Sequence, residues 1–315
     1  MTACGSQGLD PGAVPPPVSK PLVVRFLDVG QGDAIVIENG ASRVIVDGGP
    51  SSGTFGRALD SLGLNGARFT AVILSHEHFD HYAGLRALFA SSRRIVIDAF
   101  FENGNPALNS SLIELRDSIR ARVSRQEMML HDTDDPCGSG ARMCTLVLDG
   151  GARLEILRPD HQGNSPNNRS VAIKLLGPDS TSFSMWLAGD AEHEAIEYFD
   201  IAGYDETPGM SARIMKANHH GSCNGITARY LDMVRPDAIV MSLSSTNDFG
   251  FVHEQTVELL RSRMIPWYRT DVNGTITIVS SGLPGSTYSI STQRGMASQA
   301  GDADRAASPS TCANT

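Results

Sequence analysis

The sequence predicts an α/β fold in which two β-sheets pack face to face and helices cover their outer surfaces. Short apolar runs typical of strands alternate with segments of 3.6-residue periodicity along the whole chain. Each half of the chain carries its own strands and helices, although the halves show no sequence repeat. With 315 residues, of which 41% are hydrophobic, the chain is long enough for one large domain or two small ones.

In the first half, the strand-like segments are rich in β-branched residues and end at Gly, Asp or Ser. We expect strands at residues 22–28, 34–38, 43–47, 71–75 and 94–98. Apolar residues at helical spacing predict helices at residues 54–62, 81–89 and 111–123. The change of period between neighbouring segments is what indicates a mixed α/β core rather than an all-β one.

The second half has the same texture. Its strands are expected at residues 153–157, 170–176, 182–188, 213–217 and 238–243, and its helices at residues 192–201, 226–234 and 254–264. Two further strands, at residues 275–279 and 287–291, close the pattern.

The two ends of the chain differ from this pattern. Residues 1–20 are rich in Pro and Gly and predict a flexible leader, and residues 294–315 are small, polar and aperiodic and predict a disordered tail. The stretch around Cys4 resembles the end of a lipoprotein signal, which favours an exported protein anchored through Cys4, with a cytoplasmic location as the alternative. No apolar run reaches the roughly 18 residues of a transmembrane helix.

The charge balance bears on partners. Lys and Arg number 26 against 35 Asp and Glu, a formal net charge of −9, so the field of the protein repels polyanions. We therefore expect no strong nucleic-acid-binding surface. Neither the charge balance nor the motifs indicate which oligomeric state the protein has.

The five cysteines are too few for a disulfide scaffold in a chain of this length. Cys137 and Cys144 bracket a Gly-rich loop whose ends could meet at disulfide distance, which would fit an oxidising compartment. The alternative is two unpaired loop thiols. Cys223 follows a histidine pair by three residues and is either a metal ligand or a small loop residue.

Three of the nine histidines fall within six positions, in the segment SHEHFDH at residues 75–81. The segment directly follows an apolar strand, where polar side chains can converge without desolvating a core. His76 and His78 face one side of an extended chain and can hold one metal ion, whereas Asp80 and His81 enter a helical turn and can hold a second. The alternative is a solvated polar loop whose histidines only cap the next helix, but four ligand-type side chains this close together would have no structural role there.

Other predicted strands end in similar residues. Asp190 follows one strand, and His219 and His220 follow another, so three strand ends offer ligands to one cluster. The Asp190 carboxylate could bridge two ions at the separation used in two-metal hydrolysis. Imidazole and carboxylate together favour two divalent ions, with Zn²⁺ expected and Mn²⁺ or Fe²⁺ as alternatives.

These motifs resemble the metallo-β-lactamase-fold hydrolases. The segments FLDVGQGDA (26–34), VDGG (46–49), HHGS (219–222) and YRTD (268–271) are similar to the hydrolase domain of ComEC-type DNA-uptake proteins. The resemblance covers about residues 22–291. It implies a four-layer αββα sandwich, formed as a single domain by residues 21–293, with a dinuclear metal site at one edge.

The resemblance also implies roles for individual residues. His76 and His78 would bind the first ion, Asp80 and His81 the second, and Asp190 would bridge the two. His219 would be the further ligand of the second ion, leaving His220 to contact substrate or to support the ligands from outside. Outside the ligands, Asp47 and Asp33 would support the metal-binding loop.

The chain departs from the family at two places. The family's middle histidine has no counterpart in PNNRS (166–170), so water or Asn168 would complete the first site. His253, in FGFVHE (249–254), would be the missing ligand or a proton donor, or a solvent-facing residue at a helix start.

The function implied is hydrolysis by a metal-bridged hydroxide, with a phosphodiester or small molecule as substrate. Asp80, His220 or His253 would move the proton to the leaving group. Hydrolysis of a lactam or lactone is the enzymatic alternative, and a non-catalytic metal-binding or sensing module is the alternative from another class.

Overall fold

Two large mixed sheets form the centre of the structure, which is a computed structural model describing residues 20–132, 143–157, 163–204, 209–283, 285, 287–296 and 312. Within this part of the chain the first sheet has eight strands, in the order β17 (Tyr288–Thr292), β16 (Ile276–Ser280), β1 (Leu22–Phe26), β2 (Ala34–Asn39), β3 (Ser42–Gly48), β5 (Ala71–Ile73), β7 (Ala99–Glu102) and β8 (Met129–Asp132). Strands β17 to β3 pair antiparallel, whereas β3, β5, β7 and β8 pair in parallel.

The second sheet has seven strands among the described residues. Their order is β15 (Trp267–Arg269), β14 (Ala238–Met241), β13 (Ile214–Lys216), β12 (Ser184–Leu187), β11 (Ala172–Leu176), β10 (Arg153–Leu157) and β9 (Met143–Val147). Strands β12 to β15 pair in parallel and the others antiparallel. The parallel parts of both sheets bring strand carboxyl ends to one edge, where loops can carry functional side chains.

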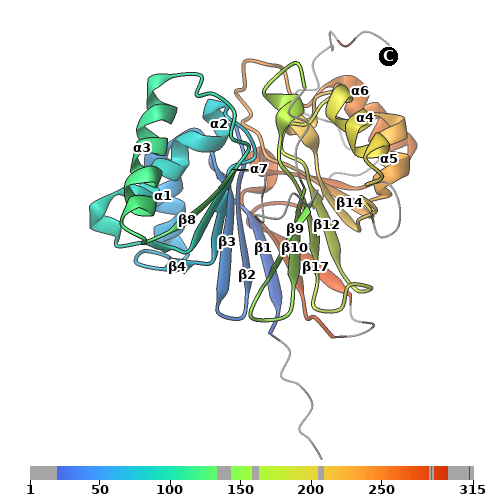
Figure 1. Cartoon of the computed structure of the whole chain (residues 1–315). Helices are drawn as coiled ribbons and strands as arrows, with labels where there is room; N and C mark the ends of the chain where they lie inside the picture. Colours follow the sequence, from blue (N-terminus) through green and yellow to red (C-terminus); the bar gives the residue numbers. More distant parts are fainter. Residues whose placement is uncertain are drawn as a thin grey trace, which may run out of the picture.

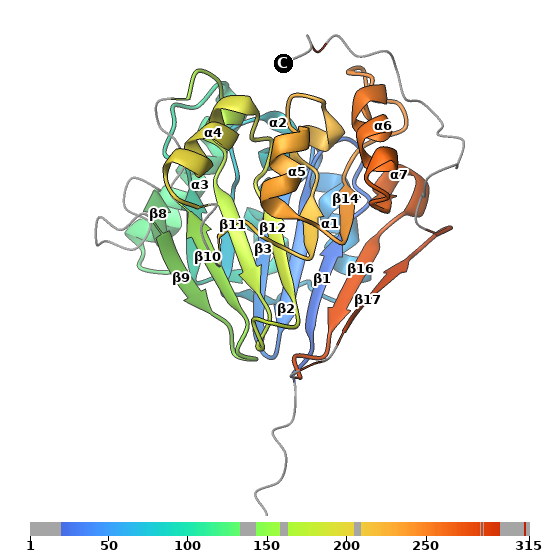
Figure 2. The same ribbon diagram turned by 90° about the vertical axis from the view of Figure 1, so that its right-hand side faces the viewer.

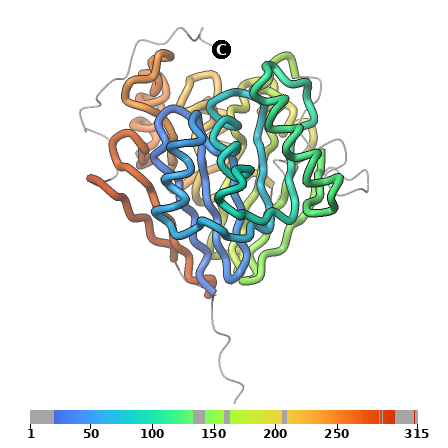
Figure 3. The backbone as a smooth tube through the Cα atoms, turned by 90° about the vertical axis from the view of Figure 1, so that its left-hand side faces the viewer, coloured from blue at the N-terminus to red at the C-terminus, as the bar shows by residue number. Residues whose placement is uncertain are grey.

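Helices cover both outer faces, as Figures 1 and 2 show. Helices α1 (Ser52–Ser61), α2 (Phe79–Tyr82) and α3 (Ser110–Ser124) lie on the first sheet, and Figure 3 views the molecule from this side. Helices α4 (His193–Ile201), α5 (Ala228–Val234) and α6 (Glu254–Ser262) lie on the second sheet, and α7 (Thr270–Asn273) follows β15. Ser51, Asn109 and Thr227 cap α1, α3 and α5 by accepting backbone N–H bonds.

Three apolar clusters separate these four layers. The central cluster contains inward-facing residues of both sheets, such as Ile37 and Ile73 from the first and Ile173 and Val240 from the second. The other two clusters bury the outer faces of the sheets against the helices. The four-layer αββα fold predicted from the sequence is therefore confirmed.

Some elements differ from their predicted form. The expected helix at residues 81–89 is one α-helical turn, α2, followed by the 3₁₀ helix η1 (Ala83–Phe89). Gly84 donates its N–H to Gly49 O at 2.8 Å and leaves no room for a Cβ beside the backbone of Gly48, which explains the tighter winding. The expected strand at 94–98 is only β6 (Val96–Ile97), paired with β4 (Arg68–Phe69) in a small separate sheet.

The predicted leader and tail lie outside the described residues, apart from Lys20, residues 294–296 and Cys312. Cys137 also lies outside them, so its pairing stays a prediction, although Cys144 is disulfide-bonded. Among the helices that the structure describes, none has the length and apolar composition needed to cross a membrane.

Candidate metal centre

The loop after β5 carries the four ligand-type residues that the sequence analysis singled out. His78 has extended backbone, and its Nδ1 lies 3.0 Å from His76 Nε2. Asp80 and His81 lie in the single turn of α2, which returns the His81 ring to within 4.2 Å of the His76 ring. A strand end followed by one helical turn therefore gathers all four side chains on one side of the loop.

Asp190 approaches the same point from the second sheet. It follows β12 and is 1% exposed. Its Oδ2 lies 3.8 Å from His76 Nε2, 3.2 Å from His81 Nε2 and 3.3 Å from His220 Nε2. One carboxylate oxygen thus faces three imidazole nitrogens, which come from two other strand ends.

Two groups of ligand-type atoms share this carboxylate. In each group all the ligand atoms lie within 4.8 Å of one another. The first contains His76, His78 and Asp190, and the second contains Asp80, His81, Asp190 and His220. The first group is one residue smaller, which agrees with the missing middle histidine.

The backbone decides which of the adjacent histidines reaches the cluster. His219 and His220 both have positive φ, 46° and 54°, an uncommon conformation for residues other than Gly. This twist turns His220 Nε2 to 3.2 Å from Asp80 Oδ2, while His219 Nδ1 lies 2.8 Å from Glu192 Oε1. His220, and not the expected His219, therefore stands in the second ligand group.

Asp47 supports the metal-binding loop through contacts to Ser75 and His81. Its carboxylate accepts hydrogen bonds from Ser75 N at 2.7 Å and Ser75 Oγ at 2.6 Å, and its Oδ2 lies 2.8 Å from His81 Nδ1. With Nδ1 donating to Asp47, the His81 ring presents Nε2 to Asp190 and Asp80. This is the supporting position expected for Asp47.

Two buried nitrogens test whether these residues fit metal ions. His81 Nε2 and His220 Nε2 are buried and have no hydrogen-bond donor or acceptor partner. Asp47 fixes the opposite nitrogen of His81, and Ser242 O, 2.7 Å from His220 Nδ1, fixes that of His220. Both Nε2 atoms therefore point into a carboxylate-lined space, where a divalent cation can displace their protons and bind.

The electrostatics of the metal-free cluster follow from its burial. Burial lowers the pKa of His76 well below its usual value, and the neighbouring His81 adds to the effect. For His220 burial also lowers the pKa, but the carboxylates of Asp190 and Asp80 outweigh it and raise the pKa to about 9. His81 behaves in the same way, because Asp190, Asp47 and Asp80 raise its pKa well above normal.

A buried lysine completes the cluster. Lys216 ends β13, is 1% exposed, and places Nζ 2.5 Å from Asp33 Oδ2 and 3.4 Å from Asp190 Oδ1. Its ammonium also donates to Gly189 O at 2.8 Å. Lys216 therefore holds the side of Asp190 that faces away from the histidines, and Asp33 is its counterion.

Residues 27–93 match the model of the metallo-beta-lactamase superfamily. Over these residues the chain is similar to the metallo-beta-lactamase superfamily. The match covers β2, β3, β5 and the histidine-rich loop, the segments that supply Asp47, His76, His78, Asp80 and His81, whereas Asp190 and His220 lie outside it.

Known proteins with a similar sequence are ComE operon protein 3 of Bacillus subtilis and Recombination protein 2 of Haemophilus influenzae. Identity to the first is 23% over 276 residues, covering 80% of this chain and 32% of the relative. Identity to the second is 24% over 269 residues, covering 83% and 29%. The chain thus spans only about a third of the length of these curated relatives.

The domain is also similar to solved structures, among them the short form of human tRNase Z. The TM-score is 0.44 with 17% sequence identity, over 69% of this chain and 91% of that one. The ComEC-type resemblance inferred from the motifs is confirmed by the curated relatives.

Two of the expected residues lie elsewhere in the domain. The Asn168 side-chain oxygen accepts from Glu192 N at 3.1 Å and Ala195 N at 3.3 Å, so Asn168 caps α4 instead of completing the first ligand group. His253 Nδ1 lies 3.0 Å from Cys223 Sγ, outside both ligand groups that share Asp190.

Lys216 was missed by sequence reasoning, as was the Glu192 partner of His219. The sequence does mark Lys216 as unusual, because it is one of only three lysines and lies in an otherwise apolar predicted strand. A charged residue in a buried strand needs a partner, and that requirement could have pointed to Asp33 and Asp190. No local signal marks Glu192, which lies 27 positions from His219.

Proposed function

We propose that this domain is a metal-dependent phosphodiesterase. The observation that carries the proposal is the shared Asp190 carboxylate, which joins two ligand groups into one cluster. His76, His78 and Asp190 would hold the first divalent ion, and Asp80, His81, Asp190 and His220 the second. We expect Zn²⁺, with Mn²⁺ or Fe²⁺ as alternatives.

When bound, two divalent ions supply an acidified water and polarise the scissile group. The chain's own residues would keep the site rigid. Asp47 fixes the His81 ring, Ser242 O fixes the His220 ring, and Lys216 orients Asp190. Such fixed outer partners are worth about 10–100-fold in metal affinity or activity.

His219 is the best-placed proton donor. His220 faces the ligand cluster, and His253 faces Cys223, so neither is available to a leaving group. His219 lies beside the cluster with its side chain 22% exposed, and Glu192 orients its ring. A positioned general acid of this kind contributes about 10²–10⁴-fold.

The test is a substrate panel. Bis-p-nitrophenyl phosphate, nitrocefin and an acyl lactone are each assayed with Zn²⁺ and with Mn²⁺. The diester should be cleaved, Asp190→Ala should abolish the activity, and the exposed Asp117→Ala should retain it. Cleavage of the lactam or lactone but not the diester would replace the proposal with an acyl hydrolase, and no cleavage at all would favour a binding module.

We also infer that the protein is exported to an oxidising compartment. The support is the disulfide bonding of Cys144 and of the pair Cys223 and Cys312, since disulfides persist mainly in oxidising compartments. Thiol titration of protein purified without reductant tests this inference. Five free thiols would overturn it.

A further inference from the structure

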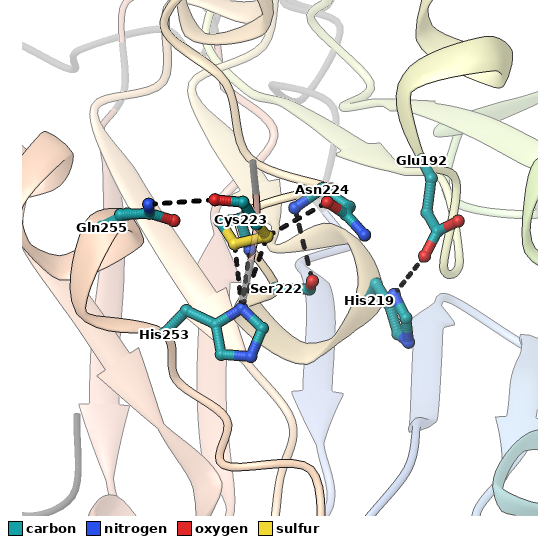
Figure 4. Close-up of a disulfide and its surroundings, with 8 residues drawn as sticks. Glu192, His219, Ser222, Cys223, Asn224, His253 and Gln255 are labelled. Atoms are coloured by element: carbon teal, nitrogen blue, oxygen red, sulfur yellow. Dashed lines mark hydrogen bonds and ion pairs between the residues drawn. A yellow bond between two sulfur atoms is a disulfide. The ribbon is translucent and has the colours of Figure 1, made fainter. Parts of the chain in front are cut away.

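A second cluster of ligand-type atoms lies beyond the centre that shares Asp190. Cys223, three residues after His220, forms a disulfide with Cys312, and their Cα atoms are 6.2 Å apart. Cys312 is also held by Gln255, whose Nε2 donates to Cys312 O at 3.4 Å. Residues 89 positions apart are thereby joined at the loop that carries His219 and Ser222 (Figure 4).

His253 points its ring at this sulfur pair. Its Nδ1 lies 3.0 Å from Cys223 Sγ and 3.9 Å from Cys312 Sγ. The same Nδ1 accepts the backbone N–H of Cys223 at 3.2 Å, so it carries a lone pair and not a proton. Figure 4 shows His253 turned toward the sulfurs, while His219 turns separately toward Glu192.

The spacing of these atoms matches a tetrahedral thiolate and imidazole site. With Zn–S near 2.3 Å and Zn–N near 2.0–2.1 Å, a sulfur and a nitrogen on one ion lie roughly 3.6 Å apart. The two nitrogen-to-sulfur distances, 3.0 and 3.9 Å, bracket that value. Before an ion can enter, the two sulfurs must separate to the roughly 3.8 Å of tetrahedral geometry, and the Cys223 N–H must release the Nδ1 lone pair.

We propose that Cys223, Cys312 and His253 form a redox-gated site for a soft divalent cation such as Zn²⁺. In the oxidised protein the disulfide closes the site, and in the reduced protein the two thiolates and His253 Nδ1 hold the ion. A fourth position stays open. The proposal is independent of the phosphodiesterase activity, because none of the three residues stands in the ligand groups that share Asp190.

The gating step is thiol–disulfide exchange with a small dithiol. The dithiol gives two electrons and two protons, the bond between Cys223 and Cys312 breaks, and the dithiol becomes its own disulfide. Binding of the cation then displaces the two thiol protons to solvent and forms two metal–sulfur bonds and one metal–nitrogen bond.

Cobalt(II) is the probe, because a thiolate ligand gives Co²⁺ a near-ultraviolet charge-transfer band that imidazole and carboxylate ligands do not give. Reduced protein, freed of dithiol under anaerobic conditions, should develop the band as one Co²⁺ binds in addition to those held by the centre that shares Asp190, and Zn²⁺ should bleach it. Oxidised protein should lack the band. This comparison uses one polypeptide and needs no variant.

Variants assign the ligands. Cys223→Ser and Cys312→Ser should abolish the band, and His253→Gln should weaken Co²⁺ binding by more than about 10-fold, the least that loss of an outer partner costs. Cys144→Ser, the matched cysteine control, and Asp190→Ala should both keep the band. The proposal is overturned if reduced wild-type protein with five free thiols shows no band, or if Cys312→Ser keeps the band unchanged.

Discussion

The ammonium of Lys216 lies 3.4 Å from Asp190 Oδ1, on the side of the carboxylate opposite the histidine rings. Asp190 Oδ2 faces those rings, so the two oxygens of one side chain have different partners. Because Lys216 also pairs with Asp33, one ammonium offsets part of the negative charge of two buried carboxylates. A site rich in carboxylates can therefore fold before any metal ion binds.

Removing this ammonium should destabilise the metal-free protein. Lys216→Met leaves Asp33 buried without its cation, and breaking such a pair costs about 3–5 kcal/mol. Urea unfolding should show this loss for Lys216→Met and almost none for Lys20→Met, since Lys20 pairs on the surface. The double variant Lys216→Met with Asp33→Asn should recover part of the stability, and no recovery would speak against the pairing.

Metal content should separate the ligands from the groups that support them. Wild-type protein should carry about two ions per chain, Asp190→Ala should lose both, and Asp47→Ala should bind roughly 10–100-fold more weakly. Asp117→Ala, on the surface of α3, serves as the control. Elemental analysis after dialysis measures the stoichiometry. Less than half an ion per reconstituted wild-type chain would refute a dinuclear centre.

The adjacent histidines should give opposite results. Asn tolerates positive φ, so His219→Asn and His220→Asn preserve the local backbone better than Ala variants would. His220→Asn should lose one ion, whereas His219→Asn should keep both and lose about 10²–10⁴-fold in rate on a diester with a poor leaving group. An activated diester should be affected much less. If His219→Asn loses metal and His220→Asn does not, the assignment is reversed.

Metal binding should strengthen as pH rises. In the metal-free protein the pKa of His220 is raised to about 9, so at pH 7 the ring is protonated and must release its proton to an incoming ion. Affinity should rise about tenfold per pH unit for this proton and level off above pH 9, and His81, whose pKa is also raised, should steepen the slope. Calorimetry in buffers of different ionisation enthalpy counts the protons.

The raised pKa of His220 has the opposite effect on the stability of the metal-free protein, which should decrease as pH rises. Because the folded pKa of His220 lies above the unfolded value near 6.5, its stabilisation is complete below pH 6.5 and is lost as pH rises toward 9. The Tm of metal-free protein should therefore fall across this window. A metal affinity that stays constant from pH 6.5 to 9 would contradict both expectations.

The sequence by itself determined the fold class and much of the candidate site. Strands and helices bury different faces, so apolar residues recur at different spacings along the chain. This periodicity can be read from the sequence, and it predicted two sheets with helices outside them. The segment at 75–81 is equally local, because a strand end and one helical turn place His76, His78, Asp80 and His81 together without help from distant residues.

Only the tertiary structure decided which neighbours these residues have. His219 and His220 look equivalent in sequence, and a pair of positive φ angles, held by contacts to other loops, sends one ring to Asp190 and the other to Glu192. His253 contacts Cys223 and Cys312, and Lys216 contacts Asp33, although these residues are far apart in the sequence. Such contacts depend on how the two sheets pack, and periodicity along the chain carries no information about that.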